Sequence, residues 1–190
     1  MKFIRTVIPD VVIIEPAVWG DKRGYFVETF RQDKLNDFLG FDINFVQDNE
    51  SKSGYGVLRG LHYQLAPTAQ TKLVRVIKGK VLDVAVDIRA GSPTFGLHVS
   101  VELSEQNKRQ LLVPRGFAHG FVVLEDDTIF AYKVDNYYSP ENDRGIAFDD
   151  PALGINWLVD KDRLKLSAKD TQQSTLANAE VFTSGQSLYA

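Results

Sequence analysis

The fold is decided by residues 81–88, which read VLDVAVDI. Every second position from Leu82 to Ile88 is aliphatic, and side chains two residues apart lie on the same face of a β-strand. The spacing therefore predicts a strand with one fully apolar face. Asp83 and Asp87 fall on the other face, where Asp83 fits either a solvent-exposed position or a functional one.

Shorter runs of the same kind occur on both sides of this strand. The expected strands cover residues 24–30, 72–78, 97–103, 109–113, 119–124 and 128–134. Many short strands at nearly regular spacing are typical of a sandwich or barrel, and not of βαβ units. We therefore predict an all-β fold.

Helical signals are few and lie outside this series. Residues 34–39 have apolar side chains at helical spacing and Gly40 follows as a C-cap, which predicts a short helix. Residues 149–151 (DDP) are typical of a turn or a helix start. Beyond Asp160 polar residues dominate, so we expect short, mostly C-terminal helices that wrap the β-body, with a loosely held end after Ala179.

The composition fits one folded domain. Of the 190 residues, 44% are hydrophobic and 25% are charged, which is enough apolar material for a core. We expect a single domain over 1–190. Within it, residues to about 45 form N-terminal strands and a short helix, 46–135 the barrel core, and 136–190 a C-terminal wrapping segment.

Charge and hydropathy exclude several classes of protein. The net charge of −3 argues against nucleic-acid binding as the main role. No apolar run reaches the ~18 residues of a membrane span, and Arg5 and Asp10 interrupt the position of a signal peptide. We expect a cytoplasmic protein without a membrane partner. The lack of cysteine excludes disulfides, thiolate nucleophiles and cysteine-ligated zinc.

Only three histidines are available for chemistry. His98 shares a strand face with polar residues, which predicts a surface position. His62 and His119 lie at strand edges among apolar residues, a setting that fits a partly buried structural histidine as well as a functional one. An imidazole with an unperturbed pKa of about 6.5 can accept a proton near neutral pH.

Residues 114–119 (PRGFAH) resemble the core of the second cupin motif, P-x-G-x-x-H. In cupins this histidine binds a metal together with an H-x-H pair and a glutamate. Here the pair is missing, because Tyr63 and Gln64 follow His62. The chain therefore resembles a cupin-type jelly roll without a metal, although His62, His119 and one carboxylate leave a facial-triad site open.

Further blocks resemble the dTDP-4-dehydrorhamnose 3,5-epimerase family. They are GVLRGLHYQ (56–64), KLVRV (72–76), DVAVDIR (83–89), GFAHGF (116–121) and YKV (132–134), with DKRGYFVE (21–28), QDN (47–49) and SAKD (167–170) at the two ends. The similarity runs from about Ile4 to Asp170. It implies a homodimer in which an N-terminal segment contributes to the partner's site, and a product that by default leads to rhamnose for cell-surface polysaccharide.

The resemblance also implies a reaction without a cofactor. The substrate would be dTDP-4-dehydro-6-deoxy-D-glucose, whose hydrogens at C3 and C5 are acidic because both carbons flank the C4 carbonyl. Inversion of either carbon needs a base, a group that stabilises the enolate oxygen, and an acid on the opposite face. The product would be dTDP-4-dehydro-L-rhamnose.

Four residues match the catalytic positions of the family. His62 matches the base and Asp170 its partner carboxylate, although the sequence alone also permits Asp170 as a helix N-cap. Tyr132 matches the acid, with a core aromatic as the alternative. Lys72 matches the cation near O4, and alternation turns it toward an apolar face, which is unusual for a lysine that only solvates a surface.

The remaining matches are substrate contacts. His119 and Asp83 resemble a second histidine–carboxylate pair, and Arg23 and Arg59 match residues that hold the diphosphate and nucleotide. Asp143 replaces a glutamate that is common in the family. Further contacts are implied for Phe26, Glu28, Gln47, Asp48, Asn49, Tyr138 and Lys169.

Three alternatives remain open at this point. One is a relative that inverts only C3 or that handles another nucleotide; Tyr132 is present in 3-epimerases and in 3,5-epimerases and does not separate them. Another is a metal-dependent cupin enzyme, and a third is a sugar-nucleotide binding protein without activity. The combination of His62, Lys72, Tyr132 and Asp170 argues against the third, since binding alone does not require a base and an acid.

Overall fold

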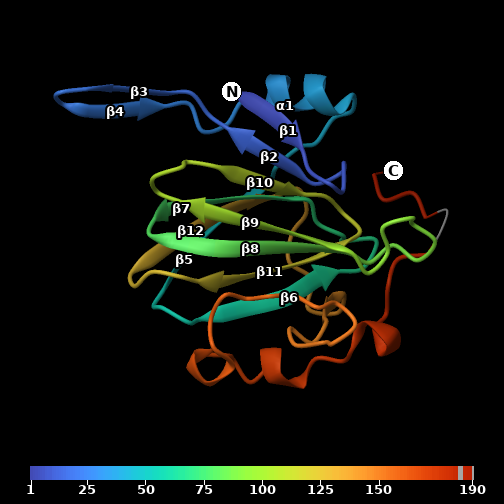
Figure 1. Ribbon diagram of the computed structural model, residues 1–190. Coiled ribbons are helices and arrows are strands. Elements are labelled where there is room, and N and C mark those ends of the chain that lie inside the picture. The colour runs from blue at the N-terminus through green and yellow to red at the C-terminus, as the bar shows by residue number, and fades with distance from the viewer. Residues whose placement is uncertain (184–185, 190) are drawn as a thin grey trace.

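Two antiparallel sheets face each other in a jelly-roll barrel (Figure 1). The computed structural model describes residues 1–183 and 186–189. The first sheet has the order β1 (Lys2–Arg5), β2 (Val12–Glu15), β10 (Gln110–Val113), β7 (Lys72–Lys78), β12 (Thr128–Val134), β5 (Gln47–Ser53). The second has the order β13 (Asp143–Gly145), β6 (Leu58–Gln64), β11 (Phe117–Val123), β8 (Lys80–Asp87), β9 (His98–Ser104). The predicted all-β jelly roll is thus confirmed.

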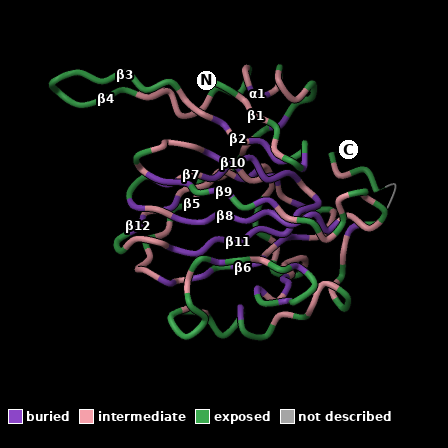
Figure 2. Tube along the Cα trace, viewed as in Figure 1, coloured by how far each residue is buried: buried purple, intermediate pink, exposed green. Residues whose placement is uncertain are grey.

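Strand β8 is buried on both faces, because it lies inside the second sheet (Figure 2). Val81 and Ala85 pack in the core between the two sheets, whereas Leu82 and Val84 belong to a second core on the outside of the sheet. Asp83 has the parity of Val81 and is fully buried in the barrel interior. Solvent exposure, one of the two options for Asp83, is therefore wrong.

The C-terminal quarter covers the outer face of the second sheet. Phe148, Trp157 and Phe182 pack there, and the Trp157 indole donates to the Phe148 carbonyl at 2.9 Å. Its helices are single 3₁₀ turns: η1 (Lys161–Arg163), η2 (Asp170–Gln172) and η3 (Leu176–Asn178). The expectation of a loosely held end after Ala179 is wrong for Phe182, which is 2% exposed, and for Leu188 and Tyr189, which form hydrogen bonds with Arg115.

Helix α1 (Gln32–Leu39) covers one side of the first sheet. Leu35 packs against the apolar side chains of β2 and β10, and Gly40 ends the helix with φ 80°. The predicted helix is confirmed and begins two residues earlier. No helix in the described ranges is long and apolar enough to cross a membrane.

A two-stranded ribbon projects away from the barrel (Figure 1). It consists of β3 (Val18–Asp21) and β4 (Gly24–Val27), which pair only with each other. The predicted strand over 24–30 is therefore too long, and its partner was not predicted. Trp19 and Phe26 contact each other on the ribbon and remain 56% and 68% exposed.

Candidate active site

A cavity of about 340 Å³ opens between the two sheets. This volume is in the range of small-molecule sites. Its walls come from β5, β6, β7, β11 and β12, and residues 167–170 close one side. The lining residues are Glu50, Ser51, Arg59, His62, Lys72, His119, Phe121, Phe130, Tyr132, Ser167, Lys169 and Asp170.

A β-bulge in β6 turns the side chains of Arg59 and His62 into this cavity. Arg59 and His62 are three residues apart, so a regular strand would place them on opposite faces. Opposite them on β11, however, Phe121 pairs with Arg59 and His119 with His62, two residues apart. The extra residue lies in β6 around Gly60, and bulges of this kind re-aim side chains.

Glycine is required at the bulge because the two strands approach closely. Gly60 has φ +131°, and a Cβ on it would lie 2.5 Å from the Cα of Gly120. A Cβ on Gly120 would in turn lie 2.9 Å from the Arg59 carbonyl oxygen. The Gly60–Gly120 contact thus sets the direction of both Arg59 and His62.

His62 is paired with Asp170 at the wall of the cavity. His62 Nε2 lies 2.7 Å from Asp170 Oδ1, a direct contact that becomes an ion pair when the imidazole takes up a proton. The ring N–H does not point along an aligned hydrogen bond, and the buried Nε2 has no other partner among the described residues. Catalytic hydrogen bonds are often poorly aligned before substrate binds. The contact leaves Nδ1 as the ring nitrogen that can accept a proton.

Asp170 is held as an anion behind His62. Burial would raise the pKa of this carboxyl, but contacts with His62 and Ser167 and a hydrogen bond from the Gly60 amide lower the pKa to about 2. The Ser167 hydroxyl donates to Asp170 Oδ2 at 2.6 Å, and the Gly60 amide donates to Oδ1 at 3.3 Å. Asp170 therefore carries a full negative charge at neutral pH. It also begins η2, so the N-cap alternative is wrong: the cap position is Lys169.

Lys72 begins β7 and extends into the cavity, as alternation with Val74 and Val76 predicts. Burial lowers the pKa of its ammonium to about 8, although the negative charges of Asp143 and Asp83 act in the opposite direction. Lys72 thus remains mostly protonated at pH 7. Few water molecules solvate its charge, so the ammonium can interact strongly with a negative charge that develops on a ligand.

A second histidine pair lies beside the first. His119 Nε2 is 2.9 Å from Asp83 Oδ1 and 3.1 Å from Oδ2, and both side chains are buried. Burial raises the pKa of Asp83, an effect that His119 and Lys72 partly offset. The resemblance predicted this pairing, and the structure places both residues next to the cavity.

Tyr132 reaches the cavity from the opposite sheet. It has the parity of Phe130 on β12 and packs against the core, but its side chain is only half-buried. Burial raises the pKa of its phenol, and the nearby Arg59 partly offsets this. The phenol therefore keeps its proton at neutral pH and can donate it.

Other predicted residues lie at the rim of the cavity. Lys169 forms an ion pair with Asp143, and the Tyr138 hydroxyl donates to the same carboxylate at 3.0 Å. On β5, Gln47 donates to Asn49 at 2.8 Å, and Asn49 is the ladder partner of Tyr132. Of these residues, Lys169 lines the cavity itself.

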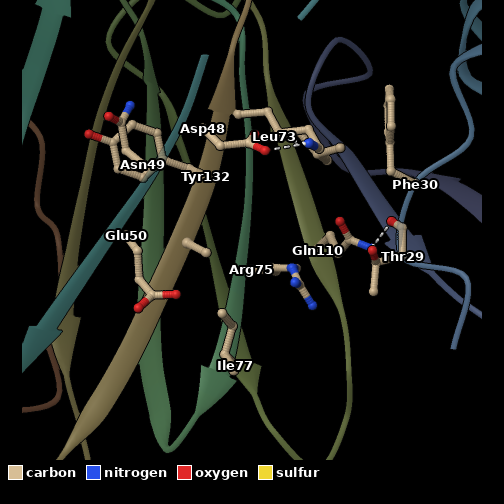
Figure 3. A pocket seen from close by; sticks show the side chains of 12 residues that line it. Thr29, Phe30, Asp48, Asn49, Glu50, Leu73, Arg75, Ile77, Gln110 and Tyr132 are labelled. Carbon is tan, nitrogen blue, oxygen red and sulfur yellow. Dashed lines mark hydrogen bonds and ion pairs between the residues drawn. The ribbon is translucent and has the colours of Figure 1, made fainter. Parts of the chain in front are cut away.

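The structure does not bring four predicted residues to this cavity. Arg23 and Phe26 lie on the exposed ribbon, where Arg23 pairs with Asp21 at 2.6 Å. Glu28 follows the ribbon and forms an ion pair with Lys34. In Figure 3 the side chains of Asp48 and Asn49 leave β5 in different directions, and Asp48 contacts Lys133 at 2.9 Å outside the barrel. The expected substrate contact of Asp48 is therefore not supported within one chain.

The remaining histidine lies away from the site. His98 begins β9 on the outer side of the barrel and is partly exposed, and burial lowers the pKa of its ring. Over residues 1–183 and 186–189, no three histidine, aspartate or glutamate side chains are grouped in a way that would hold a metal ion. His62 and His119 instead each contact one carboxylate.

Sequence reasoning missed Ser167 and Gly60. Ser167 belongs to the SAKD block, where a hydroxyl three residues before an aspartate is a recognisable local signal. Gly60 gave no local signal of this kind, because its role depends on the contact with Gly120 across the sheet.

A histidine–carboxylate pair, an ammonium and a phenol lie around one cavity of a cupin-type barrel, a set that is typical of a proton-transfer enzyme. The family model for dTDP-4-dehydrorhamnose 3,5-epimerase matches residues 5–178. The chain belongs to this family. It is 53% identical to the dTDP-4-dehydrorhamnose 3,5-epimerase of Shigella flexneri over 182 residues, which cover 96% of this chain and 99% of that one.

Solved structures agree with the family assignment. An epimerase of Legionella pneumophila in complex with dTDP-4-keto-L-rhamnose is 50% identical, with a TM-score of 0.90 over 93% of each chain. ChmJ, a 3'-monoepimerase of Streptomyces bikiniensis in complex with dTDP-quinovose, is 33% identical, with a TM-score of 0.84 over 90% of this chain and 86% of that one.

Proposed function

We propose that this chain is a dTDP-4-dehydrorhamnose 3,5-epimerase that inverts C3 and C5 of dTDP-4-dehydro-6-deoxy-D-glucose. The observation that carries the proposal is one cavity that contains the His62–Asp170 pair, the half-buried Lys72 cation and the Tyr132 phenol. The product, dTDP-4-dehydro-L-rhamnose, is an isomer of the substrate, so the reaction needs no electron donor or acceptor.

The first step is removal of the C5 proton by His62. The C5–H bond breaks, its electron pair forms the C4–C5 double bond of an enolate, and the proton moves to the imidazole. The anionic Asp170 stabilises the resulting imidazolium and holds the ring in place, the same role as in a hydrolase triad. The low pKa of Asp170 supports this role, because the carboxylate does not itself take the proton.

The second step is protonation of the same carbon from the other face. Lys72 stabilises the negative charge on O4 while the enolate exists. Tyr132, on the sheet opposite His62, gives its proton to C5, and the configuration is thereby inverted. The phenolate then regains a proton and His62 releases one, so the enzyme returns to its initial state. The same sequence at C3 completes the reaction.

Substrate binding would use the charged residues at the cavity and its rim. Arg59 and Lys169 supply cations for the diphosphate. His119 donates its Nε2–H to Asp83, so its other ring nitrogen can accept from a sugar hydroxyl. Gln47 and Asn49 line the side on which Tyr132 lies. The rim cluster of Tyr138 and Asp143 provides further polar contacts.

We further propose a homodimer in which the ribbon of one subunit completes the cavity of the other. Within one chain Arg23 and Phe26 are exposed and far from the cavity wall that the other predicted residues form. Beside the cavity, a groove of about 300 Å³ on the outer face of β7, β12 and β5 offers Arg75 and Ile77 (Figure 3). An apolar ribbon and an open sheet face support association of two copies.

A mixing experiment tests the shared site. His62→Ala and Arg23→Ala variants are each expected to be inactive or strongly impaired, but dissociated and reassociated together they should recover activity. When the two variants pair at random, about half of the dimers are mixed. Each mixed dimer has one intact site and one site that lacks both residues, so about a quarter of wild-type activity is expected. No recovery, although mixed dimers form, would contradict a ribbon that acts in trans.

The reaction itself is tested by NMR of dTDP-4-dehydro-6-deoxy-D-glucose incubated with the protein in D₂O. Deuterium at both C3 and C5 is expected, and trapping of the product with a reductase would establish its configuration. Deuterium at C3 alone would indicate a 3-epimerase. No exchange with dTDP still bound would indicate a binding protein, and about one tightly bound iron, manganese or zinc per chain would indicate a metal-dependent cupin.

A further inference from the structure

The C-terminal segment contacts the residue before β7, the loop after β8 and the loop between β10 and β11. The family model ends its match at residue 178, so residues 179–190 lie beyond it. In Figure 1 the red parts of this segment lie beside the barrel, near the loops below β6 and again close to the C label. Phe182 anchors its first part, since the Ala90 amide donates to the Phe182 carbonyl at 2.8 Å.

Tyr189 is the second anchor. Its hydroxyl lies 2.9 Å from the Thr71 hydroxyl, and it accepts a hydrogen bond from the Arg115 amide at 3.1 Å. The Arg115 guanidinium lies over the Tyr189 ring at 5.1 Å from its centre and donates to the Leu188 carbonyl at 2.6 Å. Phe41, just after α1, also contacts the Tyr189 ring, with ring centroids 4.9 Å apart.

Thr71 connects this anchor to the site. It is fully buried and directly precedes Lys72 at the beginning of β7. Its amide donates to Asp135 Oδ1 at 2.6 Å, and Asp135 also accepts from Arg115 at 3.1 Å. Thr71 is thus held on its backbone by the end of β12 and on its side chain by Tyr189.

We propose that Tyr189 is a positioning residue for Lys72: its hydroxyl fixes Thr71, and thereby the start of β7 and the Lys72 side chain. The inference rests on the proposed function, in which Lys72 stabilises the enolate at O4. It adds to the candidate active site a supporting residue from the C-terminal segment, which the family model does not include. Tyr189 does not line the cavity, so it acts through Thr71 and does not touch the substrate.

The expected consequences follow from the role of Lys72. A small displacement of the ammonium weakens its interaction with the enolate more than with the neutral ketone, so kcat should fall while KM changes little. Water that enters beside a loosened β7 end would also restore solvation of Lys72. Because burial is what lowers the pKa of this lysine, the pKa should then rise.

The test is Tyr189→Phe, which removes the hydroxyl and keeps the ring. Loss of one hydrogen-bonding group should lower kcat about 3- to 10-fold, leave KM within about twofold, and move the alkaline limb of the kcat profile to higher pH. Thr71→Ser should behave as wild type. Thr71→Val should resemble Tyr189→Phe, and the double variant should lose no more than either single one.

The matched control is Glu180→Gln, which breaks the ion pair of the same segment with Arg144 but does not touch Thr71. It should leave both kcat and the alkaline limb unchanged. The inference is overturned if Tyr189→Phe equals wild type, or if Glu180→Gln causes the same change. If the wild type shows no deuterium exchange into the substrate, the proposed function is contradicted. The positioning role of Tyr189 is then still tested by NMR of labelled lysine, which compares the pKa of Lys72 in Tyr189→Phe with that in the wild type.

Discussion

His62 and His119 are direct partners across the β6–β11 ladder, and each ring contacts its own buried carboxylate. The two carboxylates differ in their electrostatics. Contacts with His62 and Ser167 outweigh burial and lower the pKa of Asp170 to about 2, whereas burial raises the pKa of Asp83. Two similar geometries therefore shift the pKa values of their carboxyls in opposite directions.

This difference predicts unequal effects of removing the charges. Asp170→Asn should lower kcat by about 10²–10⁴-fold, because the imidazolium loses its anion and the ring loses its orientation. Asp83→Asn should cost less than about tenfold, since a neutral amide oxygen can still accept from His119. Steady-state kinetics of both variants, with circular dichroism to verify folding, measure the ratio. Equal losses would contradict the assignment of His62–Asp170 as the base pair.

Deuterium exchange at C5 distinguishes the role of the base from that of the acid. His62→Asn should abolish deuterium uptake at C5, because no group remains to remove the proton. Tyr132→Phe should still exchange C5 with D₂O, since His62 can remove and return a proton on the same face, but inversion should fall about 10²–10⁴-fold. NMR in D₂O measures uptake, and product trapping measures inversion. A Tyr132→Phe variant that inverts C5 at the wild-type rate would exclude Tyr132 as the acid.

The pKa of Lys72 predicts the alkaline limb of the pH profile. Burial lowers this pKa to about 8, so the ammonium is present below pH 8 and is lost as the pH rises through this value. The rate constant kcat should therefore fall above about pH 8. Lys72→Arg should remove this limb, because a guanidinium stays charged, although its different shape should lower kcat at every pH. An unchanged limb in Lys72→Arg would assign it to another group.

The same burial predicts that Lys72→Met stabilises the fold while it removes activity. The lysine pKa falls from 10.5 to about 8 on folding, which corresponds to about 3 kcal/mol of destabilisation at neutral pH. The sign follows from linkage: between pH 8 and 10.5 the unfolded state binds more protons, so wild-type stability rises with pH. The gain from methionine should be largest below pH 8 and vanish by pH 10.5.

Urea unfolding at several pH values measures this gain. Lys161→Met is the control, because that side chain is 77% exposed and should give little change. A Lys72→Met variant that is no more stable than wild type at pH 7 would show that Asp83 and Asp143 fully compensate the burial of the ammonium.

The sequence predicted those parts of the site that lie on regular strands. Alternation turned Lys72 and Tyr132 inward correctly, because β7 and β12 follow a two-residue period at these positions. The same rule could not place Arg59 and His62 on one face, because the bulge between them depends on a contact with another strand. Local sequence patterns also could not predict the ribbon or the contacts of Tyr189. These features depend on parts of the chain that are distant in sequence, or on a second copy.

The bulge supplies a final prediction, Gly60→Ala. A Cβ at this position would lie 2.5 Å from the Gly120 Cα, and the φ of +131° is itself unfavourable for alanine. The matched control is Gly24→Ala, where φ is +133° but no atom lies within 4 Å of the added Cβ. Urea unfolding should show a loss of about 2–4 kcal/mol for Gly60→Ala and a smaller loss for Gly24→Ala. Because the bulge orients both Arg59 and His62, the folded fraction of Gly60→Ala should also have a lower kcat. Equal stability of Gly60→Ala and Gly24→Ala would show that strands β6 and β11 can move apart without a loss of stability.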